Sequence, residues 1–386
     1  MTPTDRGELP EIRFLDLAAQ RERLGGRIED AIARVLSHGQ FIMGPEVAQL
    51  EGELARYSGV TDAVACSSGT DALVLALMAW DLGPGDAVFV PSFTFASTAE
   101  AVALLGAAPV FVDIDAVSFN MDPGSLSAAV EHARGAGLVP RAVIPVDLFG
   151  LPARYADIRA VAETVGMRVL ADAAQSYGAT EGGRRVGALA DATCISFFPS
   201  KPFGAYGDGG AVLTDDPGLA ERLRSVRVHG QGRDKYENIR VGLNARLDTI
   251  QAAVLLEKLT ILDEELAARD RVASTYRTRL DHLVDNPTVP PDRTSAWAQY
   301  TIRSSGRDDL ARVLAGKEVP TAVYYRNPLH LSPAYASFPR APQGLPVTEE
   351  VAGQVLSLPM HPYLTDEAVD RIVDALEAAA ADTAAS

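Results

Sequence analysis

Short runs of apolar residues alternate, over residues 59–213, with segments that repeat apolar positions at helical spacing. Helical spacing predicts helices such as those at 70–80 and 156–165. Such alternation is typical of a mainly parallel sheet that is covered by helices on both faces. Ligands of these sheets bind at the carboxyl ends of the strands, so we expect a site there. Buried strands are predicted at 63–66, 87–90, 109–112, 142–146 and 168–172.

The pattern changes after Arg246. Residues 246–283 have the spacing of one long helical stretch, which we expect to break near Asp263. This stretch would link a large domain, residues 1–266, to a small C-terminal domain, residues 267–386. The other predicted elements are a first helix at 17–36, a strand at 298–303, and helices at 308–314 and after Asp366.

The charge balance narrows the class of partner. The chain of 386 residues has a formal net charge of −16, which argues against non-specific binding to nucleic acids or membranes. No apolar run is long enough to span a bilayer, and no apolar signal segment opens the sequence. Two cysteines, Cys66 and Cys194, provide no disulfide framework. We therefore expect a cytoplasmic globular protein, in which a local basic pocket is still compatible with an anionic substrate.

One lysine stands out by its surroundings. Arginine supplies 31 of the 35 basic residues, yet Lys201 lies among phenylalanines, prolines and glycines in the segment 196–210. Desolvation lowers a lysine pKa below its ordinary value of about 10.4, and a deprotonated amine attacks carbonyl groups. Arginine cannot take this role, because it stays protonated. The alternative is a lysine that packs its stem on the turn and extends its charge into solvent.

Two predicted strands end in residues suited to binding charge. Ser68, Gly69 and Thr70 follow the first strand and open a helix, whose N–H groups and dipole form an anion site. Capping of that helix is the alternative use of these residues. Asp172 ends the last predicted strand of this region, and Gln175 follows it. The acid either caps a turn or holds a positive charge, such as a protonated pyridine nitrogen.

Further candidates follow other predicted elements. Phe95 lies just after a strand, where it either stacks on a flat ring or belongs to the core. Asn244 and Arg246 precede a helix. They either cap this helix or reach an anionic ligand.

A loop towards the C-terminus combines tyrosines with basic residues, and it contains Tyr324, Tyr325, Arg326 and His330. Such a loop suits a flat, anionic substrate, and ordinary packing is the alternative. The six histidines of the chain lack the spacing of zinc ligands, and there is no P-loop or dinucleotide fingerprint. We therefore expect no metal centre, and the sequence disfavours a nicotinamide-dependent oxidoreductase.

Taken together, these segments resemble the DegT/StrS family of pyridoxal-phosphate (PLP) sugar aminotransferases. The resemblance implies the fold-type I α/β architecture, with a mainly parallel seven-stranded sheet in the large domain and a smaller C-terminal α/β domain. It also implies a homodimer whose active sites are shared between subunits. The similar segments are FLDLAAQRERL, FIMGPEVAQLE, CSSGTDAL, DAAQSYGA, FFPSKPFGAYGDGGA, GLNARLDTIQAA and PLHLSPAY, which cover nearly the whole chain.

The resemblance assigns roles around the cofactor ring. Lys201 matches the family's Schiff-base lysine. Related sugar dehydratases carry a histidine at that position, so the lysine favours transamination. Asp172 would pair with the pyridine nitrogen and Gln175 with the ring hydroxyl, and Phe95 would stack on the ring.

The same resemblance assigns the phosphate contacts. Gly69, Thr70 and Ser196 would bind the cofactor phosphate, and Asn244 would reach it from the neighbouring subunit. Arg246 would meet a carboxylate there, which belongs to the amino donor or to the substrate.

The substrate side departs from the family pattern. Tyr324, Tyr325 and His330 are the candidate substrate contacts, but Arg326 and Asn327 follow the tyrosines where the family commonly reads YYPxPLH.

A second departure lies in the segment VDLFG, where Asp147 stands in place of a frequent histidine. Both departing segments border the sugar site in the family, so the substrate is left open. The segments HGQGRDKYEN and GLNARLDTIQAA look most like the branch that aminates 3-keto UDP-hexuronic acids.

The implied function is the conversion of a keto sugar, nucleotide-linked, to an amino sugar, with glutamate as the donor. One alternative keeps this chemistry and acts on a cyclitol or another secondary-metabolite ketone. A second alternative is a PLP-binding regulator without turnover, which does not need a transfer base such as Lys201.

Overall fold

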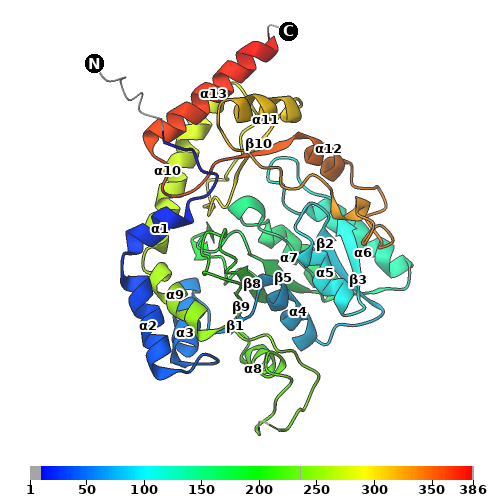
Figure 1. Ribbon diagram of the computed structural model, residues 1–386. Helices are drawn as coiled ribbons and strands as arrows, with labels where there is room; N and C mark the ends of the chain where they lie inside the picture. Colours follow the sequence, from blue (N-terminus) through cyan, green and yellow to red (C-terminus); the bar gives the residue numbers. More distant parts are fainter. Residues whose placement is uncertain (1–9, 235, 385–386) are drawn as a thin grey trace.

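A seven-stranded sheet forms the centre of the computed structural model, which describes residues 10–234 and 236–384 (Figure 1). Strand β9 pairs antiparallel with both of its neighbours, and the other strands of the sheet pair parallel. The expectation of a mainly parallel seven-stranded sheet is therefore confirmed. In spatial order the strands are β1 (Asp62–Cys66), β9 (Gly210–Thr214), β8 (Ala192–Ser196), β5 (Arg168–Asp172), β4 (Val139–Val143), β2 (Asp86–Pro91) and β3 (Ala108–Val112).

The predicted strands differ from the observed ones in two respects. β4 starts earlier than predicted and ends at Val143, because Pro145 has no N–H with which to continue the ladder. β8 and β9 lie outside the predicted strands, because their apolar runs are short: Thr193 interrupts the run in β8, and the run in β9 is limited to residues 211–213. Both are buried inside the sheet all the same.

Helices cover the sheet on both faces, as expected. α4 packs against β8 and β9, whereas α6 and α7 pack against strands β3, β4 and β5. The helices around the sheet are α3 (Pro45–Ser58), α4 (Gly69–Ala79), α5 (Ser97–Leu104), α6 (Pro123–Gly135), α7 (Tyr155–Val165) and α8 (Pro217–Val226). Small elements between them are η1 (Leu148–Gly150), β6 (Thr180–Glu181) and β7 (Arg184–Arg185).

Two glycines divide the first predicted helix into α1 (Leu17–Leu24) and α2 (Arg27–His38). Gly25 has a φ of 58°, and its N–H donates to the carbonyl oxygens of Arg21 and Glu22, which caps α1. α2 then packs against α9 (Thr249–Leu259). The break between α9 and α10 (Leu262–Leu280) lies within three residues of the expected position at Asp263.

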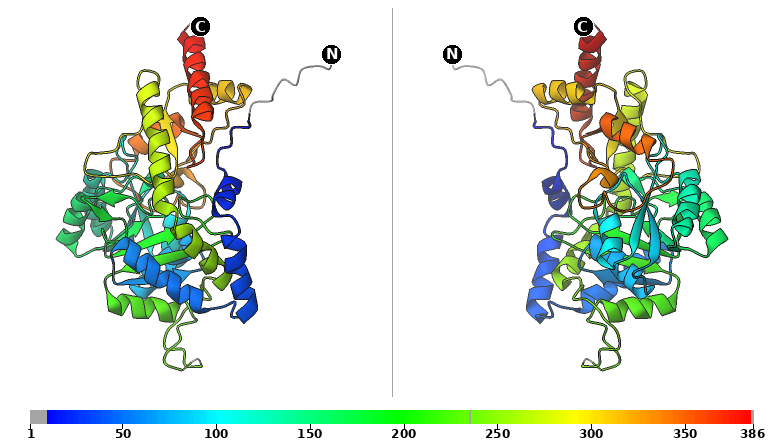
Figure 2. Two further views of the ribbon diagram at one scale, coloured as in Figure 1. Left: turned by 90° about the vertical axis from the view of Figure 1, so that its left-hand side faces the viewer. Right: turned by 90° about the vertical axis from the view of Figure 1, so that its right-hand side faces the viewer.

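A second hydrophobic core surrounds β10 (Tyr300–Arg303) and β11 (Val355–Leu358), which pair antiparallel. α10 and α13 (Asp366–Ala384) run side by side over this core, at the top of the molecule in Figures 1 and 2. α11 (Arg307–Gly316), η2 (Leu329–Leu331) and α12 (Pro346–Gln354) complete the C-terminal part.

Helix α10 joins the two cores. Its residue Leu262 belongs to the core of the large sheet, and its residue Val272 belongs to the second core. The domain boundary at residues 266–267 falls within this helix and stays a prediction. Over the described residues, no helix is long and apolar enough to cross a membrane.

The segment between α8 and α9 extends away from the body of the molecule (Figures 1 and 2). Three of its large hydrophobic side chains are strongly exposed, namely Tyr236, Ile239 and Val241.

Candidate active site

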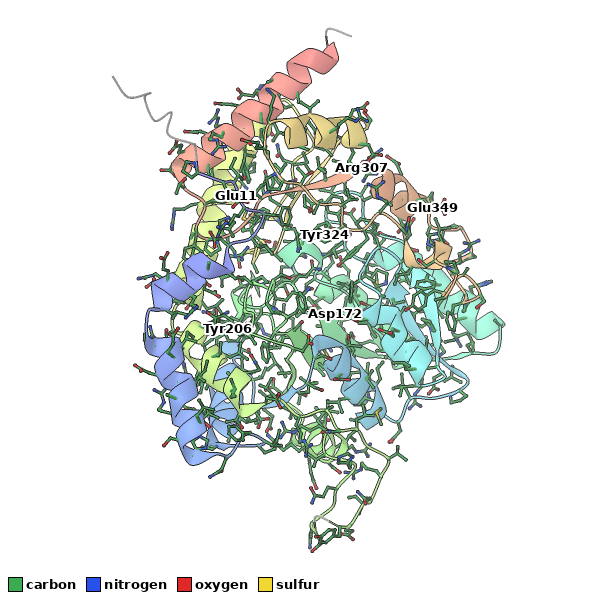
Figure 3. The ribbon with its side chains drawn as sticks, in the orientation of Figure 1. Glu11, Asp172, Tyr206, Arg307, Tyr324 and Glu349 are labelled. Carbon is green, nitrogen blue, oxygen red and sulfur yellow. The ribbon has the colours of Figure 1, made fainter. Side chains whose placement is uncertain are left out.

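A cavity of about 500 Å³ opens at the carboxyl ends of several strands. Asp172 lies at its floor at the end of β5, and Tyr324 approaches from the C-terminal part of the chain (Figure 3). The structure brings together in this lining the predicted residues Gly69, Thr70, Phe95, Asp172, Gln175, Ser196, Lys201, Tyr324 and Tyr325.

Asp172 is 6% exposed and held by two hydrogen bonds. The hydroxyl of Thr98 donates to its Oδ2 at 2.8 Å, and the N–H of Ala174 donates to its Oδ1 at 3.3 Å. Burial raises the pKa of the Asp172 carboxyl, while the Thr98 hydrogen bond and the charge of Lys201 act in the opposite direction. A cation in the cavity would therefore favour the ionised carboxylate.

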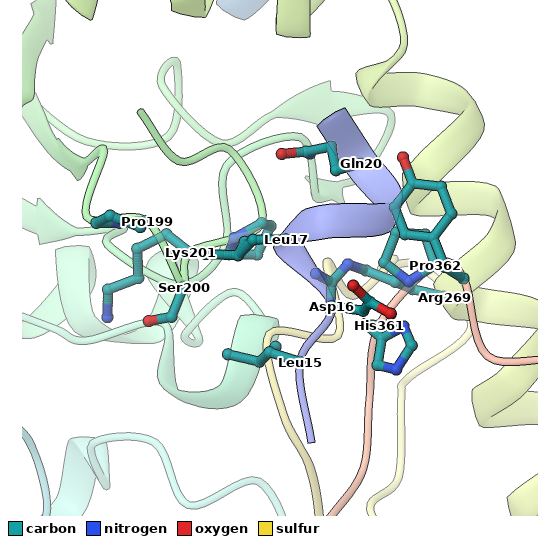
Figure 4. Close-up of a pocket in the computed structure, with 12 residues that line it drawn as sticks. Leu15, Asp16, Leu17, Gln20, Pro199, Ser200, Lys201, Arg269, His361 and Pro362 are labelled. Atoms are coloured by element: carbon teal, nitrogen blue, oxygen red, sulfur yellow. The ribbon is translucent and has the colours of Figure 1, made fainter. Parts of the chain in front are cut away.

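Lys201 lies in the turn that joins β8 to β9. Burial lowers the pKa of its amine, and the attraction of Asp172 opposes that shift. The side chain extends away from Asp16, Arg269 and His361, which lie on the other side of the turn (Figure 4). The structure therefore places a desolvated amine in the same cavity as a carboxylate.

The first turn of α4 borders the cavity. The Ser68 hydroxyl accepts the N–H of Asp71 at 3.0 Å and so caps the helix. A Cβ on Gly69 would lie 2.7 Å from the Cβ of Ser196, so only glycine leaves space there. Thr70 shares a 2.6 Å hydrogen bond with Ser97. The capping alternative therefore applies to Ser68, while the helix N-terminus still faces the cavity with its positive end.

Gln175 connects the floor of the cavity to the tyrosine loop. Its Oε1 accepts the N–H of Phe149 at 2.6 Å, and its Nε2 donates to the hydroxyl of Tyr325 at 3.3 Å. Phe95 is 58% exposed, with its ring centroid 6.3 Å from that of Tyr325. Exposed aromatic rings at a cavity rim leave a face on which a flat ligand can stack.

Three predicted site residues lie outside the lining of this cavity, as far as the described residues show. Asn244 is exposed and Arg246 half-buried, both just before α9. His330 is 3% exposed, and its ring nitrogens lie 2.7 Å from the Ser92 hydroxyl and 3.1 Å from Glu349. These contacts fix the loop that carries the tyrosines, and the substrate role of His330 stays a prediction.

Asp147 also lies outside the lining, although its neighbour Val146 is part of it. The Asp147 carboxylate is fully buried and accepts hydrogen bonds from Ser176, Tyr155 and the N–H of Ala153, each between 2.7 and 2.8 Å. Burial raises its pKa to about 7. Asp147, which stands where the family frequently has a histidine, therefore occupies a buried polar site inside the protein.

Sequence reasoning missed several residues that line the cavity or contact its lining. Thr98 orients Asp172, and Ser97 bonds to Thr70. Both lie in the segment PSFTFASTAEAV, where the aromatic residues are the more visible signal. Asp208 and Gln299 also line the cavity. No group of three or more metal-ligating side chains occurs among the residues that the structure describes.

Comparisons with known proteins identify the family of this chain. The chain is 47% identical over 366 residues to UDP-2-acetamido-2-deoxy-3-oxo-D-glucuronate aminotransferase of Pseudomonas aeruginosa, with 95% of this chain and 99% of that protein covered. A DegT DnrJ EryC1 StrS aminotransferase from Brucella abortus superposes with a TM-score of 0.94 at 50% identity, covering 95% of this chain and 98% of that one.

A further solved structure is NtdA from Bacillus subtilis with bound cofactor PMP. It has a TM-score of 0.87 and 30% identity, and the match covers 98% of this chain and 87% of that one. The model of the DegT/DnrJ/EryC1/StrS aminotransferase family matches residues 22–377. The chain therefore belongs to the DegT/DnrJ/EryC1/StrS aminotransferase family.

Proposed function

We propose that this aminotransferase binds PLP in the cavity, with Lys201 as the Schiff-base residue, and converts a nucleotide-linked keto sugar to an amino sugar. Glutamate is the proposed donor. The observation that carries the proposal is the presence of a desolvated amine, a buried carboxylate and a helix N-terminus in one cavity.

The residues present fit the cofactor. The start of α4 suits a phosphate, because Gly69 lets the helix N-terminus approach Ser196 closely at the edge of the cavity. Asp172 suits a protonated pyridine nitrogen, Gln175 suits the ring hydroxyl, and Phe95 supplies an aromatic face. When bound, PLP supplies an electron sink for the negative charge that develops on the donor carbon. NtdA, with its bound PMP, supports this assignment.

The chain's own residues supply the proton transfer. Burial favours the neutral form of the Lys201 amine, so Nζ can accept a proton from the donor's α-carbon and release it again on the same face. Thr98 holds the Asp172 carboxylate in one orientation. Tyr324 and Tyr325 line the cavity, so we expect their loop to limit the access of water to the reacting groups.

The proposed acceptor is a 3-keto UDP-hexuronic acid. The relative from Pseudomonas aeruginosa supports it, because that protein is named for a UDP-linked 3-oxo-glucuronate. In the proposed homodimer, Asn244 and Arg246 complete the cavity of the partner, where Arg246 would meet a carboxylate. A cytoplasmic location is part of the proposal, and two free, buried cysteines support it.

The test begins with the absorbance of the PLP-loaded enzyme. Added glutamate should remove the visible band of the bound cofactor. Single keto compounds are then added to this aminated enzyme, and the return of the band reports an accepted amino group. We expect a 3-keto UDP-hexuronic acid to restore the band faster than the matching 3-keto UDP-hexose without the carboxylate.

The outcomes separate the alternatives. Faster return with a keto cyclitol would favour the secondary-metabolite alternative. A band that glutamate leaves unchanged, in enzyme that binds PLP, would favour a regulator without turnover and reject the proposed function.

A further inference from the structure

A second lysine is buried beside the turn that carries Lys201. Lys258 lies on α9 and is 2% exposed, although lysine is almost never fully buried without a partner. Its Nζ donates to the carbonyl oxygen of Gly204 at 2.7 Å and lies 4.1 Å from the ring centroid of Tyr206. Both partners belong to the same turn, and Tyr206 lies next to α9 (Figure 3).

The turn is closed on itself by backbone hydrogen bonds. The N–H of Lys201 donates to the carbonyl oxygen of Phe198 at 2.9 Å, and the N–H of Ala205 donates to that of Phe197 at 2.7 Å. Gly204 packs directly on this backbone, because a Cβ there would lie 2.6 Å from the carbonyl oxygen of Pro199. A displacement of Gly204 is therefore transmitted to the backbone on both sides of Lys201.

Helix α9 holds the turn at two points. Gln251 accepts the N–H of Tyr206 at 2.9 Å with its Oε1, and Lys258 binds Gly204 two turns further along the same face of the helix. Burial lowers the pKa of Lys258 to about 8, and the attraction of Glu265 opposes that shift. Burying such an amine costs free energy of folding, so packing alone does not explain why a lysine lies in the core.

We propose that Lys258 is a positioning residue for Lys201: by holding the Gly204 carbonyl oxygen it fixes the turn, and with it the place of the Lys201 amine in the cavity. The inference rests on the proposed function for the role of Lys201. It goes beyond that function, because Lys258 does not line the cavity among the described residues and acts through the backbone.

The test replaces Lys258 with methionine, which keeps an unbranched side chain as long as the lysine's four-carbon stem and removes its donor. Three quantities are measured in PLP-loaded enzyme: the pH midpoint of the visible band, the rate at which glutamate removes the band, and the melting temperature. A loosened turn admits water around Lys201, so the midpoint should rise by about 0.5–1 pH unit. The rate at saturating glutamate should fall about tenfold, with less than about a twofold change in the half-saturating concentration.

The matched control is Leu255→Ala. Leu255 is fully buried one turn earlier on α9, so its truncation destabilises the same helix and leaves the Gly204 contact in place. We expect a lower melting temperature with a wild-type midpoint and rate. If Lys258→Met behaves in the same way, Lys258 only stabilises the fold and the inference is wrong.

Should the methionine variant fail to fold, Lys258→Gln supplies the same test, because its amide nitrogen falls one bond short of Gly204. Its midpoint should also rise, and an unchanged midpoint counts against positioning. Failure of the proposed function is recognised separately, because the wild-type enzyme would then show no visible band with PLP or no response to glutamate.

Discussion

The proposed chemistry depends on two ionisable side chains on which burial acts in opposite directions. Burial lowers the pKa of Lys201 towards a neutral amine and raises that of Asp172 towards a neutral acid. Their mutual attraction opposes both shifts. A protonated pyridine nitrogen beside Asp172 would keep the carboxylate ionised. Bound cofactor would therefore favour an ionised Asp172 together with a neutral Lys201 amine.

Lys201→Ala should fold normally and lose transamination by at least about 10³-fold, because the base that moves the proton is gone. Lys201→Arg should fail equally, since the guanidinium stays protonated. Turnover is measured with glutamate and the accepted keto sugar. Lys317→Ala, at an exposed lysine after α11, is the control and should match the wild type. Normal turnover by Lys201→Ala would reject its assignment.

Asp172→Asn should still bind PLP but turn over about 10²–10³-fold more slowly, because an amide cannot stabilise a protonated ring nitrogen. The measurement is the rate at saturating PLP and glutamate. Asp147→Asn is a matched control, since Asp147 is buried nearby and lies outside the cavity lining. It should lose stability and keep most of its rate. Equal rates for the two variants would show that Asp172 acts only as a structural acid.

At the scale of elements, the site depends on where strands end and helices begin. Asp172 ends β5, Ser196 ends β8, and Gly69 begins α4. The close approach of α4 to β8 leaves no space for a Cβ between Gly69 and Ser196. The phosphate site that we propose there would thus depend on helix–strand packing, which a glycine permits.

Gly69→Ala should weaken PLP binding by about tenfold or more, because the new methyl group lies 2.7 Å from the Ser196 Cβ and displaces the start of α4. The dissociation constant for PLP is measured by titration of the visible band. Gly52→Ala is the control, because a Cβ in α3 at that position meets nothing within 4 Å. It should keep wild-type affinity. Similar affinities for both variants would place the phosphate elsewhere.

His361, in the segment between β11 and α13, is 5% exposed, and its Nε2 lies 3.2 Å from the carbonyl oxygen of Arg13. Burial, with the charge of Arg269, lowers its pKa to about 4. The unfolded chain therefore binds a proton at higher pH than the native protein, and stability is lost as the pH falls from about 6.5 to 4. The loss between pH 7 and 4.5 should be about 2–3 kcal/mol.

This pH dependence is measured by urea unfolding of the apo-protein at the two pH values. His361→Gln can keep a hydrogen bond to Arg13 and has no titrating ring, so its loss should be smaller than that of the wild type by the same amount. An equal loss in both proteins would mean that His361 titrates normally.

At the scale of the whole molecule, the two residues that we assign to the partner's site, Asn244 and Arg246, lie outside the cavity lining of their own chain among the described residues. Asn244 and Arg246 lie beside the segment that extends from the body, where Ile239 and Val241 are 53% and 84% exposed. Exposed apolar side chains on an extended segment are typical of a surface that a second copy covers. These features support the proposed dimer, in which a two-fold axis would exchange the two segments.

The shared site is tested by mixing inactive subunits. Lys201→Ala and Arg246→Ala homodimers should each be nearly inactive. After unfolding and refolding together at equal ratio, one site of each mixed dimer has both wild-type residues. Activity should therefore recover to about a quarter of the wild type. Tagged subunits verify the exchange, and an absence of recovery would place Lys201 and Arg246 of one chain in the same site.

The sequence by itself determined the α/β class, most of the strands of the large sheet and several of the residues that line the cavity. These features depend on local patterns: apolar runs define buried strands, and an amine among aromatic residues indicates a desolvated lysine. The segments around Lys201, Asp172 and Gly69 carried the family assignment, which the comparisons confirm. The shared active site, the homodimer and the domain boundary stay predictions.

Only the tertiary structure decided which residues support these groups. Thr98 meets Asp172 from 74 positions away, and Lys258 meets Gly204 from 54 positions away. The antiparallel direction of β9 and the burial of Asp147 within a hydrogen-bonded site are decided in the same way. Such contacts depend on how strands and helices pack in space, and neither residue type nor spacing along the chain specifies the partner.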